Sequence, residues 1–204
     1  MQKITVGILI YDNVEVLDLT GPYDVFCLTR TLDKPDFADP SPFEIFLISE
    51  YPRPVTAMGG MKVLPDHTFE DCPMLDILVV PGGLGERWEH NNHVIHHFLR
   101  ARSKKVKTLA SVCTGAFFLG KAGLLSERKA TTHTLSLNRM REAFPDVRVV
   151  EDKRFVEDGN IITSAGISAG IDMSLHIVSK YLGEDAARLT AREVEYPYPE
   201  SDDR

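Results

Sequence analysis

This sequence has few cysteines, no long apolar run and no leader segment. Each of these features excludes a class of protein. Only 3 of the 204 residues are cysteines. This low, odd number, without a CxxC motif, indicates reduced thiols and not a disulfide framework. No apolar run approaches the ~20 residues that a membrane span needs. The N-terminus enters a strand-like stretch without signal-peptide architecture, so we expect a cytoplasmic protein with no membrane partner.

Positive charge is also scarce. The chain has 23 Lys and Arg residues against 30 Asp and Glu residues, a formal net charge of −7. This acidic balance argues against a dedicated nucleic-acid binder, because such proteins carry a basic surface. The one basic cluster lies between Arg100 and Lys107 and is typical of a cationic helix end followed by a loop. We therefore expect no nucleic-acid partner.

The remaining composition fits one folded domain over residues 1–204. Hydrophobic residues make up 43% of the chain and charged residues 26%, as in ordinary globular proteins. A chain of this length buries about 70% of its surface on folding, so it forms a sizeable core without disulfide or metal staples. We predict a single domain that uses no cofactor.

Predicted strands and helices alternate along the chain. Apolar and β-branched runs predict strands at 4–11, 43–49, 75–80, 106–111, 147–150 and 154–163, and a hairpin at 55–64. Helical spacing predicts helices at 23–32, 92–102, 114–122, 136–144 and 167–182, the first of them capped by Thr20. The alternation predicts an α/β fold with a mainly parallel sheet and helices on both faces.

The clearest chemical signal is Cys113, which follows an apolar strand and precedes small residues that open a helix. This is the arrangement of a nucleophile elbow. The helix macrodipole should lower the pKa of a cysteine there, and the N–H of Thr114 is free to bind an oxyanion. The alternative is a buried structural thiol. Cys27 and Cys72 lack such a setting, and we interpret them as core or loop thiols.

Two further features follow predicted strands. Asp18 lies between two leucines after the first strand, at the sheet edge where doubly wound folds bind ligands. A helix cap or a turn aspartate is the alternative for it. Gly82 and Gly83 follow the strand at 75–80, where glycines can turn backbone N–H groups toward a ligand. That loop matches neither a Walker nor a dinucleotide motif, so alone it indicates a tight turn.

Histidine supplies two candidates. His133 could activate a cysteine by taking its proton, and a histidine satisfied by a structural hydrogen bond is the alternative. His93 and His97 have the i, i+4 spacing of metal ligands. No carboxylate or cysteine pattern accompanies them, so we interpret them as part of a solvated helix face and expect no metal.

Taken together, five segments resemble the ThiJ/PfpI superfamily. They are DLTGPYDVF from Asp18, VVPGGLG from Val79, SVCTGAFFLGKAGLL from Ser111, ATTH from Ala130 and GISAGIDMSLHIV from Gly166. They occur in the family's order and span nearly the whole chain. Within the superfamily, the chain is most similar to the isocyanide hydratase branch and to the N-terminal domains of AraC-type regulators. The resemblance implies a flavodoxin-like three-layer sandwich, a homodimer and a cysteine at the nucleophile elbow.

The resemblance also implies roles for particular residues. Cys113 matches the family nucleophile, and Asp18 matches the acidic residue beside it in the hydratase branch. Thr114 matches the hydratase threonine, and its N–H would line an oxyanion pocket with that of Gly83. His133 matches a histidine that lies near the cysteine in several branches, although hydratases are not expected to depend on it.

Some departures from related families restrict the activity. Intracellular proteases of the superfamily carry His directly after the nucleophile, where this chain has Thr114, so peptidase activity is not expected. Glutaminases of similar fold need a His-x-Glu pair, which follows neither His133 nor His176. The hydratase branch usually has Trp at the position of Thr134. AraC-type regulators add a helix-turn-helix domain, and we expect none in a chain that ends at Arg204.

These observations favour a cysteine-dependent enzyme that hydrates a small-molecule isonitrile to an N-substituted formamide. In this hypothesis Cys113 is the nucleophile, Asp18 is the general acid and base, and Gly83 and Thr114 stabilise the oxyanion. A sensor without turnover is the first alternative, because an activated thiol is also easily oxidised. A glyoxalase-type activity on 2-oxoaldehydes, which is also found in the superfamily, is the second.

Overall fold

Seven strands form the central sheet in the computed structural model, which describes residues 3–36 and 38–198. The strand order is β10-β11-β7-β6-β1-β2-β5. Neighbouring strands are parallel throughout, except that β10 runs antiparallel to β11. The strands are β1 (Ile4–Leu9), β2 (Phe43–Ser49), β5 (His67–Thr68), β6 (Ile77–Val80), β7 (Thr108–Ser111), β10 (Phe155–Asp158) and β11 (Ile161–Ser164).

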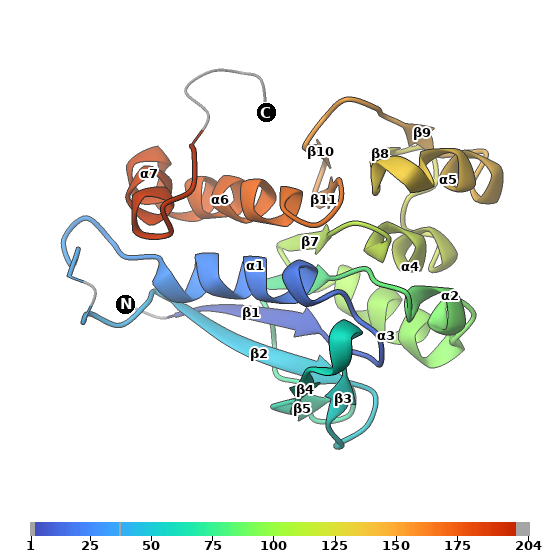
Figure 1. The fold of residues 1–204 in the computed structure, drawn as a ribbon, viewed down its shortest axis with the longest axis horizontal. Coiled ribbons are helices and arrows are strands. Elements are labelled where there is room, and N and C mark those ends of the chain that lie inside the picture. Colours follow the sequence, from blue (N-terminus) through green and yellow to red (C-terminus); the bar gives the residue numbers. More distant parts are fainter. Residues whose placement is uncertain (1–2, 37, 199–204) are drawn as a thin grey trace.

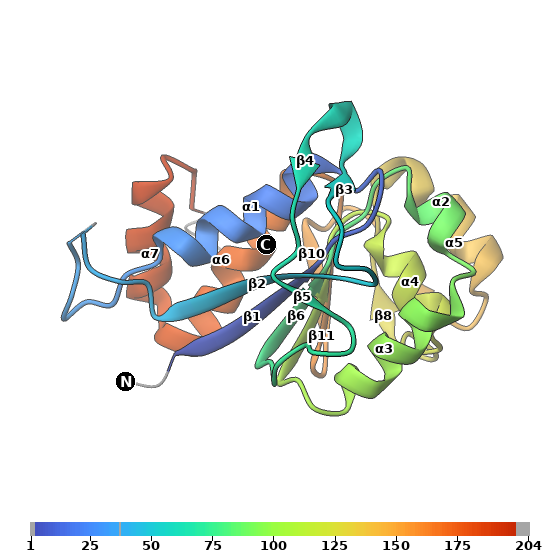
Figure 2. The same ribbon diagram turned by 90° about the horizontal axis from the view of Figure 1, so that it is seen from below.

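Helices cover both faces of this sheet, as Figure 2 shows. One face carries α1 (Val16–Leu28), α6 (Ala169–Leu182) and α7 (Glu184–Glu193), and Figure 1 shows α1 lying along β1 and β2. The other face carries α3 (His93–Ser103) and α4 (Gly115–Lys121), with α2 (Glu86–Glu89) and α5 (Leu137–Ala143) beside them. The predicted three-layer α/β fold is confirmed.

Burial on both faces explains why the central strands could be predicted from their apolar residues. Every residue of β6 and β7 is buried, as expected for parallel strands covered on both faces. The core continues into the helices through large buried side chains such as Phe26 of α1 and Phe118 of α4. The well-packed centre holds the carboxyl ends of β1, β6 and β7 in fixed positions, and the loops that follow these strands build the site.

Smaller elements complete the fold. The predicted hairpin is present as β3 (Val55–Thr56) and β4 (Lys62–Val63), with the short 3₁₀ turn η1 (Met58–Gly60) between them. A second two-stranded pair joins β8 (Lys129–Ala130) to β9 (Arg148–Val149) in parallel, and η2 (Thr134–Ser136) leads into α5. Within the described ranges, no helix has the length and apolar character needed to cross a membrane.

The first helix begins earlier than predicted. Val16 opens α1 after Glu15, so Thr20 lies inside the helix, where its hydroxyl donates to the Val16 carbonyl at 2.9 Å. The error arose because Pro22 is typical of a first turn but here lies in the second. The consequence for the site is direct. Asp18 is neither a cap nor a turn residue but a buried member of the first helical turn.

Several short or weakly patterned elements were not predicted, among them α2, α7, β5 and β8. The helix α7 buries Ala186, Ala187 and Ala191, and these small residues produce little hydrophobic pattern in the sequence. The strand β5 has only two residues and pairs with the end of β2. These elements were overlooked because they are short or have little hydrophobic pattern, so that tertiary packing and not local sequence defines them.

Candidate active site

Cys113 occupies the predicted sharp turn between β7 and α4. Its φ is +57°, a left-handed conformation that side-chain-bearing residues seldom adopt. Two carbonyls fix the turn, since the Cys113 N–H lies 3.2 Å from the Ser164 oxygen and 3.1 Å from the Ala165 oxygen. A Cβ on Gly115 would collide with the Val80 carbonyl, so only glycine fits at this position, two residues after Cys113. Such backbone strain is typical of functional sites.

The thiol itself is almost enclosed. Cys113 is 6% exposed, and the N–H groups of Thr114 and Ile167 donate hydrogen bonds to its sulfur. Ile167 has a φ of +54°, which is an outlier for a β-branched residue. Sequence reasoning did not single out Ile167, although it lies in one of the segments that carried the family resemblance. Two backbone donors from different elements therefore converge on one sulfur atom.

Asp18 is the buried carboxyl of the site, with no exposed surface. Its Oδ2 accepts a hydrogen bond from the Gly82 N–H at 3.0 Å. Burial raises the pKa of Asp18 to about 7, and the charge of Glu15 adds to the rise. Hydrogen bonds from Gly82, Cys113 and Ile167 partly oppose that rise in pKa. Near neutral pH the carboxyl therefore exists in both protonated and ionised forms.

The Cys113 thiol and the Asp18 carboxyl act on one another. Burial, together with the nearby charge of Asp18, raises the pKa of Cys113 to about 12. The prediction that the helix end lowers this pKa is therefore wrong for the free protein. The donors Thr114 and Ile167 do favour the thiolate, but desolvation outweighs them. Only one of the two acids ionises at neutral pH, and a proton can pass between them.

The glycine loop packs directly on the elbow. A Cβ on Gly82 would lie 2.5 Å from the Thr114 nitrogen and 3.0 Å from Asp18 Oδ2, so a side chain has no space there. Gly83, with φ +133°, donates its N–H to Thr114 Oγ1 at 3.1 Å. The loop thus holds both predicted partners of the cysteine. The Gly83 N–H, predicted to line an oxyanion pocket, is engaged by the Thr114 hydroxyl.

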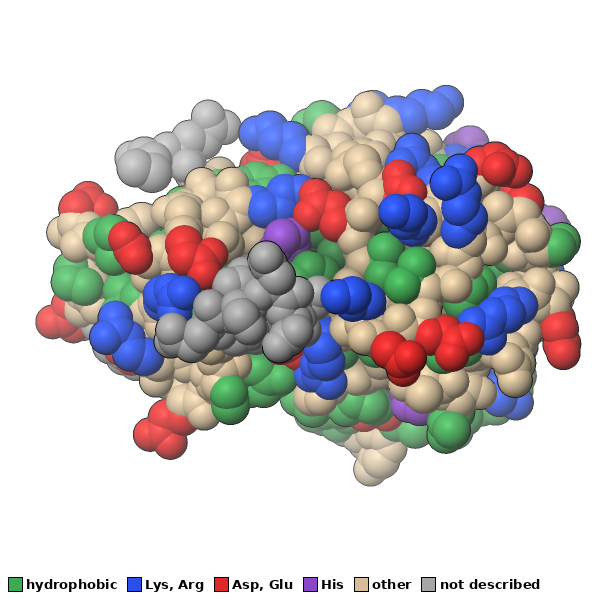
Figure 3. Space-filling view, turned by 90° about the horizontal axis from the view of Figure 1, so that it is seen from above, with side chains coloured by type: hydrophobic (Ala, Val, Ile, Leu, Met, Phe, Trp, Pro, Cys, Tyr) green, Lys and Arg blue, Asp and Glu red, His purple; other side chains and the backbone are tan. Residues whose placement is uncertain are grey.

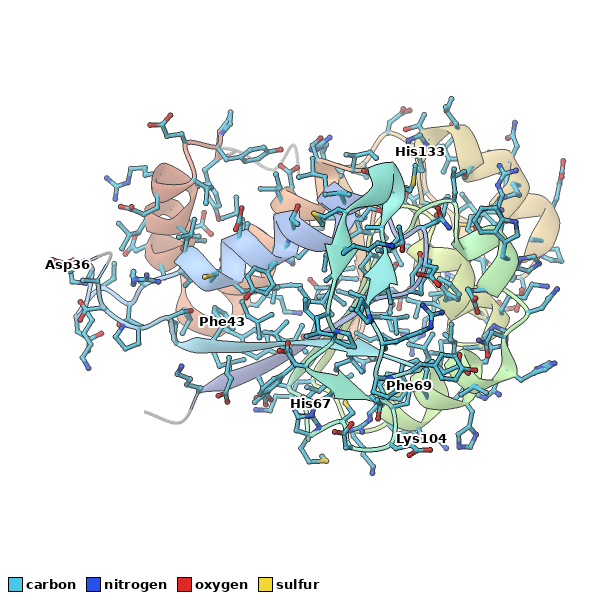
Figure 4. All side chains as sticks on the ribbon, turned by 60° about the horizontal axis from the view of Figure 1, so that its bottom comes forward. Asp36, Phe43, His67, Phe69, Lys104 and His133 are labelled. Carbon is cyan, nitrogen blue, oxygen red and sulfur yellow. The ribbon has the colours of Figure 1, made fainter. Side chains whose placement is uncertain are left out.

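His133 borders the site in a different way. Its Nδ1 accepts the Leu135 N–H at 3.2 Å, which caps η2, and a Cβ on Gly166 would collide with its ring. Figure 4 shows His133 near the upper edge of the view, well away from Phe43 at the start of β2. Within the described residues no hydrogen bond joins His133 to Cys113. Its neighbour Thr132, which sequence reasoning did not single out, donates its hydroxyl to the Cys113 carbonyl at 2.8 Å.

The histidine pair on α3 lies away from these groups. His93 and His97 are exposed, in agreement with a solvated face, whereas His96 between them is 4% exposed. In the part of the chain that the structure describes, no group of three or more His, Cys, Asp or Glu side chains is placed to hold a metal ion. The candidate chemistry therefore rests on Cys113 and Asp18.

Comparison with known proteins agrees with the geometry. An isonitrile hydratase of Pseudomonas putida is 37% identical over 201 residues, covering 98% of this chain and 82% of the relative. The transcriptional regulator GbdR of Pseudomonas aeruginosa is 30% identical over 182 residues, covering 89% of this chain but 47% of the regulator. The match therefore spans about four fifths of the hydratase and about half of the regulator.

Solved structures show the same fold. A ThiJ/PfpI family protein from Pseudomonas syringae superposes with a TM-score of 0.83 at 31% identity, covering 99% of this chain and 79% of that one. DJ-1beta of Drosophila melanogaster has a TM-score of 0.80 at 20% identity, covering 96% and 100% of the two chains. The DJ-1/PfpI family model matches residues 4–180, and the chain therefore belongs to the DJ-1/PfpI family.

Proposed function

We propose that the protein is an isonitrile hydratase that converts a small isonitrile to an N-substituted formamide. The observation that carries the proposal is the buried pair of Cys113 and Asp18, in which the carboxyl has a pKa of about 7. A group with that pKa can give and take protons in one cycle at neutral pH. The 37% identity to an isonitrile hydratase over 98% of the chain supports the same reaction.

The first step forms a covalent intermediate. Asp18 takes the thiol proton, and the Cys113 sulfur attacks the terminal carbon of R–N≡C to form an S–C bond. Asp18 then delivers its proton to that carbon. The product is a thioimidate, S–CH=N–R, and the carboxylate is restored. The N–H groups of Thr114 and Ile167 stabilise the thiolate in this step, because both donate to the sulfur.

The second step adds water. Asp18 removes a proton from water as the oxygen attacks the thioimidate carbon, and the nitrogen receives that proton. Thr114 stabilises charge on the oxygen, and Gly83 contributes through its bond to Thr114 Oγ1. The C–S bond then breaks, the hydroxyl proton passes through Asp18 to the sulfur, and the formamide leaves. One water is consumed and no redox change occurs.

A sensor without turnover is the second candidate. The same thiol can be oxidised to a sulfenic or sulfinic acid, and a protonated Asp18 would donate a hydrogen bond to a sulfinate. Relatives named as transcriptional regulators favour this alternative, because two of them match 89% and 66% of this chain. A glyoxalase-type reaction on 2-oxoaldehydes is the third candidate. One assay can distinguish the three candidate functions.

One parallel experiment tests the proposal. The protein is incubated separately with p-nitrophenyl isocyanide, methylglyoxal and hydrogen peroxide, with Cys113→Ser as the control. We expect multiple turnovers of the isocyanide to the formamide and none with Cys113→Ser. Turnover of methylglyoxal alone would contradict the hydratase proposal. A mass gain on Cys113 with peroxide, without turnover of either substrate, would favour the sensor.

We also propose a homodimer with no nucleic-acid partner. Leu17, Gly21 and Val25 of α1 line a groove with Ile171 of α6, and Leu17 is 36% exposed. Such an apolar groove is suited to an interface between copies. On the face seen in Figure 3, basic and acidic side chains are interspersed and do not form one basic stripe. Sedimentation analysis of wild type and Leu17→Asp tests the dimer.

A further inference from the structure

An ion pair between a buried carboxylate and a partly exposed guanidinium joins two segments that flank the site. Glu86, the first residue of α2, is 1% exposed, and its Oε2 lies 2.6 Å from Nη2 of Arg139 on α5. A carboxylate buried to this extent needs a charged partner, since an unpaired buried charge is strongly destabilising. The mechanism proposed above uses neither residue. The pair therefore needs an explanation of its own.

Glu86 follows the glycine loop directly and is hydrogen-bonded to it. Its N–H donates to the Gly83 carbonyl at 3.2 Å, closing the turn that follows the loop. The N–H of Gly83 in turn donates to Thr114 Oγ1, and the N–H of Gly82 holds Asp18. The backbone of Glu86 is thus hydrogen-bonded to the same loop whose glycines contact Thr114 and Asp18.

Arg139 also contacts the helix that follows the nucleophile. Its guanidinium lies 3.7 Å from the centre of the Phe117 ring on α4. The Phe117 N–H donates to the Thr114 carbonyl at 3.0 Å, so this ring stands one turn beyond the elbow. A planar guanidinium can stack on a ring and bind a carboxylate simultaneously, which a lysine ammonium cannot reproduce. One side chain therefore contacts both the glycine-loop wall and the elbow helix.

We infer that Arg139 is a positioning residue for the Cys113 site, and that its guanidinium clamps the glycine loop, through Glu86, against α4, through Phe117. The clamp keeps Gly82 and Gly83 in contact with Asp18 and Thr114 and keeps water away from the thiol. The inference rests on Cys113 being the reacting group of the proposed function. Its test, alkylation of that thiol, does not require the substrate to be an isonitrile.

Loosening the clamp should make the alkylation of Cys113 faster and substrate turnover slower. Water would reach Cys113, so the apparent pKa of its alkylation should fall from about 12 toward the ordinary thiol value. Alkylation at pH 8 should then accelerate by about tenfold for each unit by which the pKa falls. Turnover should decrease, because Asp18 and Thr114 lose their fixed places. If Arg139 only stabilised the fold, a variant of normal stability would show neither faster alkylation nor slower turnover.

The experiment compares four variants by iodoacetamide labelling of Cys113 between pH 6 and 10, followed by peptide mass spectrometry. Arg139→Lys keeps the charge but loses the stacking fork. The double variant E86L/R139M removes both charges with similar volumes, which often preserves stability. Arg139→Met leaves Glu86 unpaired. Arg141→Met is the matched control, because Arg141 lies on the same helix and pairs with the exposed Glu151.

Denaturant unfolding accompanies each labelling series. We expect the double variant to unfold near the wild-type midpoint, and yet to show, like Arg139→Lys, a lower alkylation pKa and faster labelling at pH 8. Arg141→Met should match wild type. A wild-type labelling profile in Arg139→Lys, or in a normally stable double variant, would overturn the inference. If the double variant does not fold, Arg139→Lys alone decides. Changed labelling without isonitrile turnover in wild type would support the clamp and reject only the proposed reaction.

Discussion

Cys113 and Cys72 are both buried, at 6% and 8% exposure, yet their surroundings differ in kind. Burial raises the pKa of each thiol. Among the residues that the structure describes, the Cys72 thiol donates a hydrogen bond only to the neighbouring Pro73 carbonyl, at 3.5 Å. Cys113 has a strained backbone, two N–H donors at its sulfur and Asp18 beside it. The comparison predicts that burial alone leaves the Cys72 thiol unreactive, whereas burial together with a proton partner and anion donors makes the Cys113 thiol reactive.

The largest effect on turnover should come from replacing Cys113, whereas the same replacement at Cys72 should have none. Cys113→Ser should lower kcat/KM for a confirmed substrate by more than about 10⁴-fold, because the covalent step is lost. Cys72→Ser should leave turnover unchanged, since the charges that act on its thiol are those of Arg102 and Asp71 and not that of Asp18. Steady-state kinetics on both variants measures this difference. Equal losses would show that the two thiols are not distinguished by their surroundings.

Removing the proton partner is the next largest change. Asp18→Asn keeps the shape and an oxygen for the Gly82 N–H but removes the proton relay. We expect kcat/KM to fall by about 10²–10⁴-fold, the usual loss for a general acid–base group. Asp24→Asn, an exposed position on the same helix, is the matched control and should behave as wild type. Retention of activity within about threefold, far below that range, would show that Asp18 does not move the proton.

The same substitution should change stability in a pH-dependent way. The folded pKa of Asp18 is raised from 3.8 to about 7, so its contribution to stability is full below pH 3.8 and is lost as pH rises through 7. Asn does not titrate. Asp18→Asn should therefore gain stability relative to wild type between pH 5 and pH 8, by about 3 kcal/mol. Denaturant unfolding at both pH values measures the gain, and a constant difference would contradict it.

The contrast between the two cysteines was partly visible in the sequence. The elbow could be predicted because an apolar strand, Cys113 and a run of small residues are local features. The position of Asp18 at the site could be predicted, but its helix was predicted to start too late because Pro22 was interpreted as a first-turn residue. The family resemblance supplied the expectation that Asp18 and Cys113 belong together.

Other features depend on residues that are distant in the chain. The pKa of Cys113 was predicted to be lowered because the helix end is local, whereas the burial that raises it comes from the whole fold. Ile167 meets the thiol from a segment 54 residues away, and Glu86 pairs with Arg139 across 53 residues. Neither has a spacing signature. Their partners are chosen by sheet order and helix packing, which a single sequence does not display.

The smallest predicted effect concerns His133 and separates the acid–thiol pair from a Cys–His dyad. In a dyad, histidine takes the thiol proton, so His133→Ala should abolish both turnover and thiolate formation. Here the Nδ1 of His133 accepts the Leu135 N–H, and its ring packs over Gly166, so it shapes the wall beside Ile167. We expect His133→Ala to lower kcat/KM by about tenfold or less, about 1.4 kcal/mol in the barrier. His133→Asn, which can keep an acceptor for Leu135, should recover part of that loss if the role is one of shape. Kinetics on both variants, with the pH profile of Cys113 alkylation, makes the distinction. A loss of about 10³-fold in both variants, well beyond what a wall residue explains, would replace Asp18 by His133 as the base.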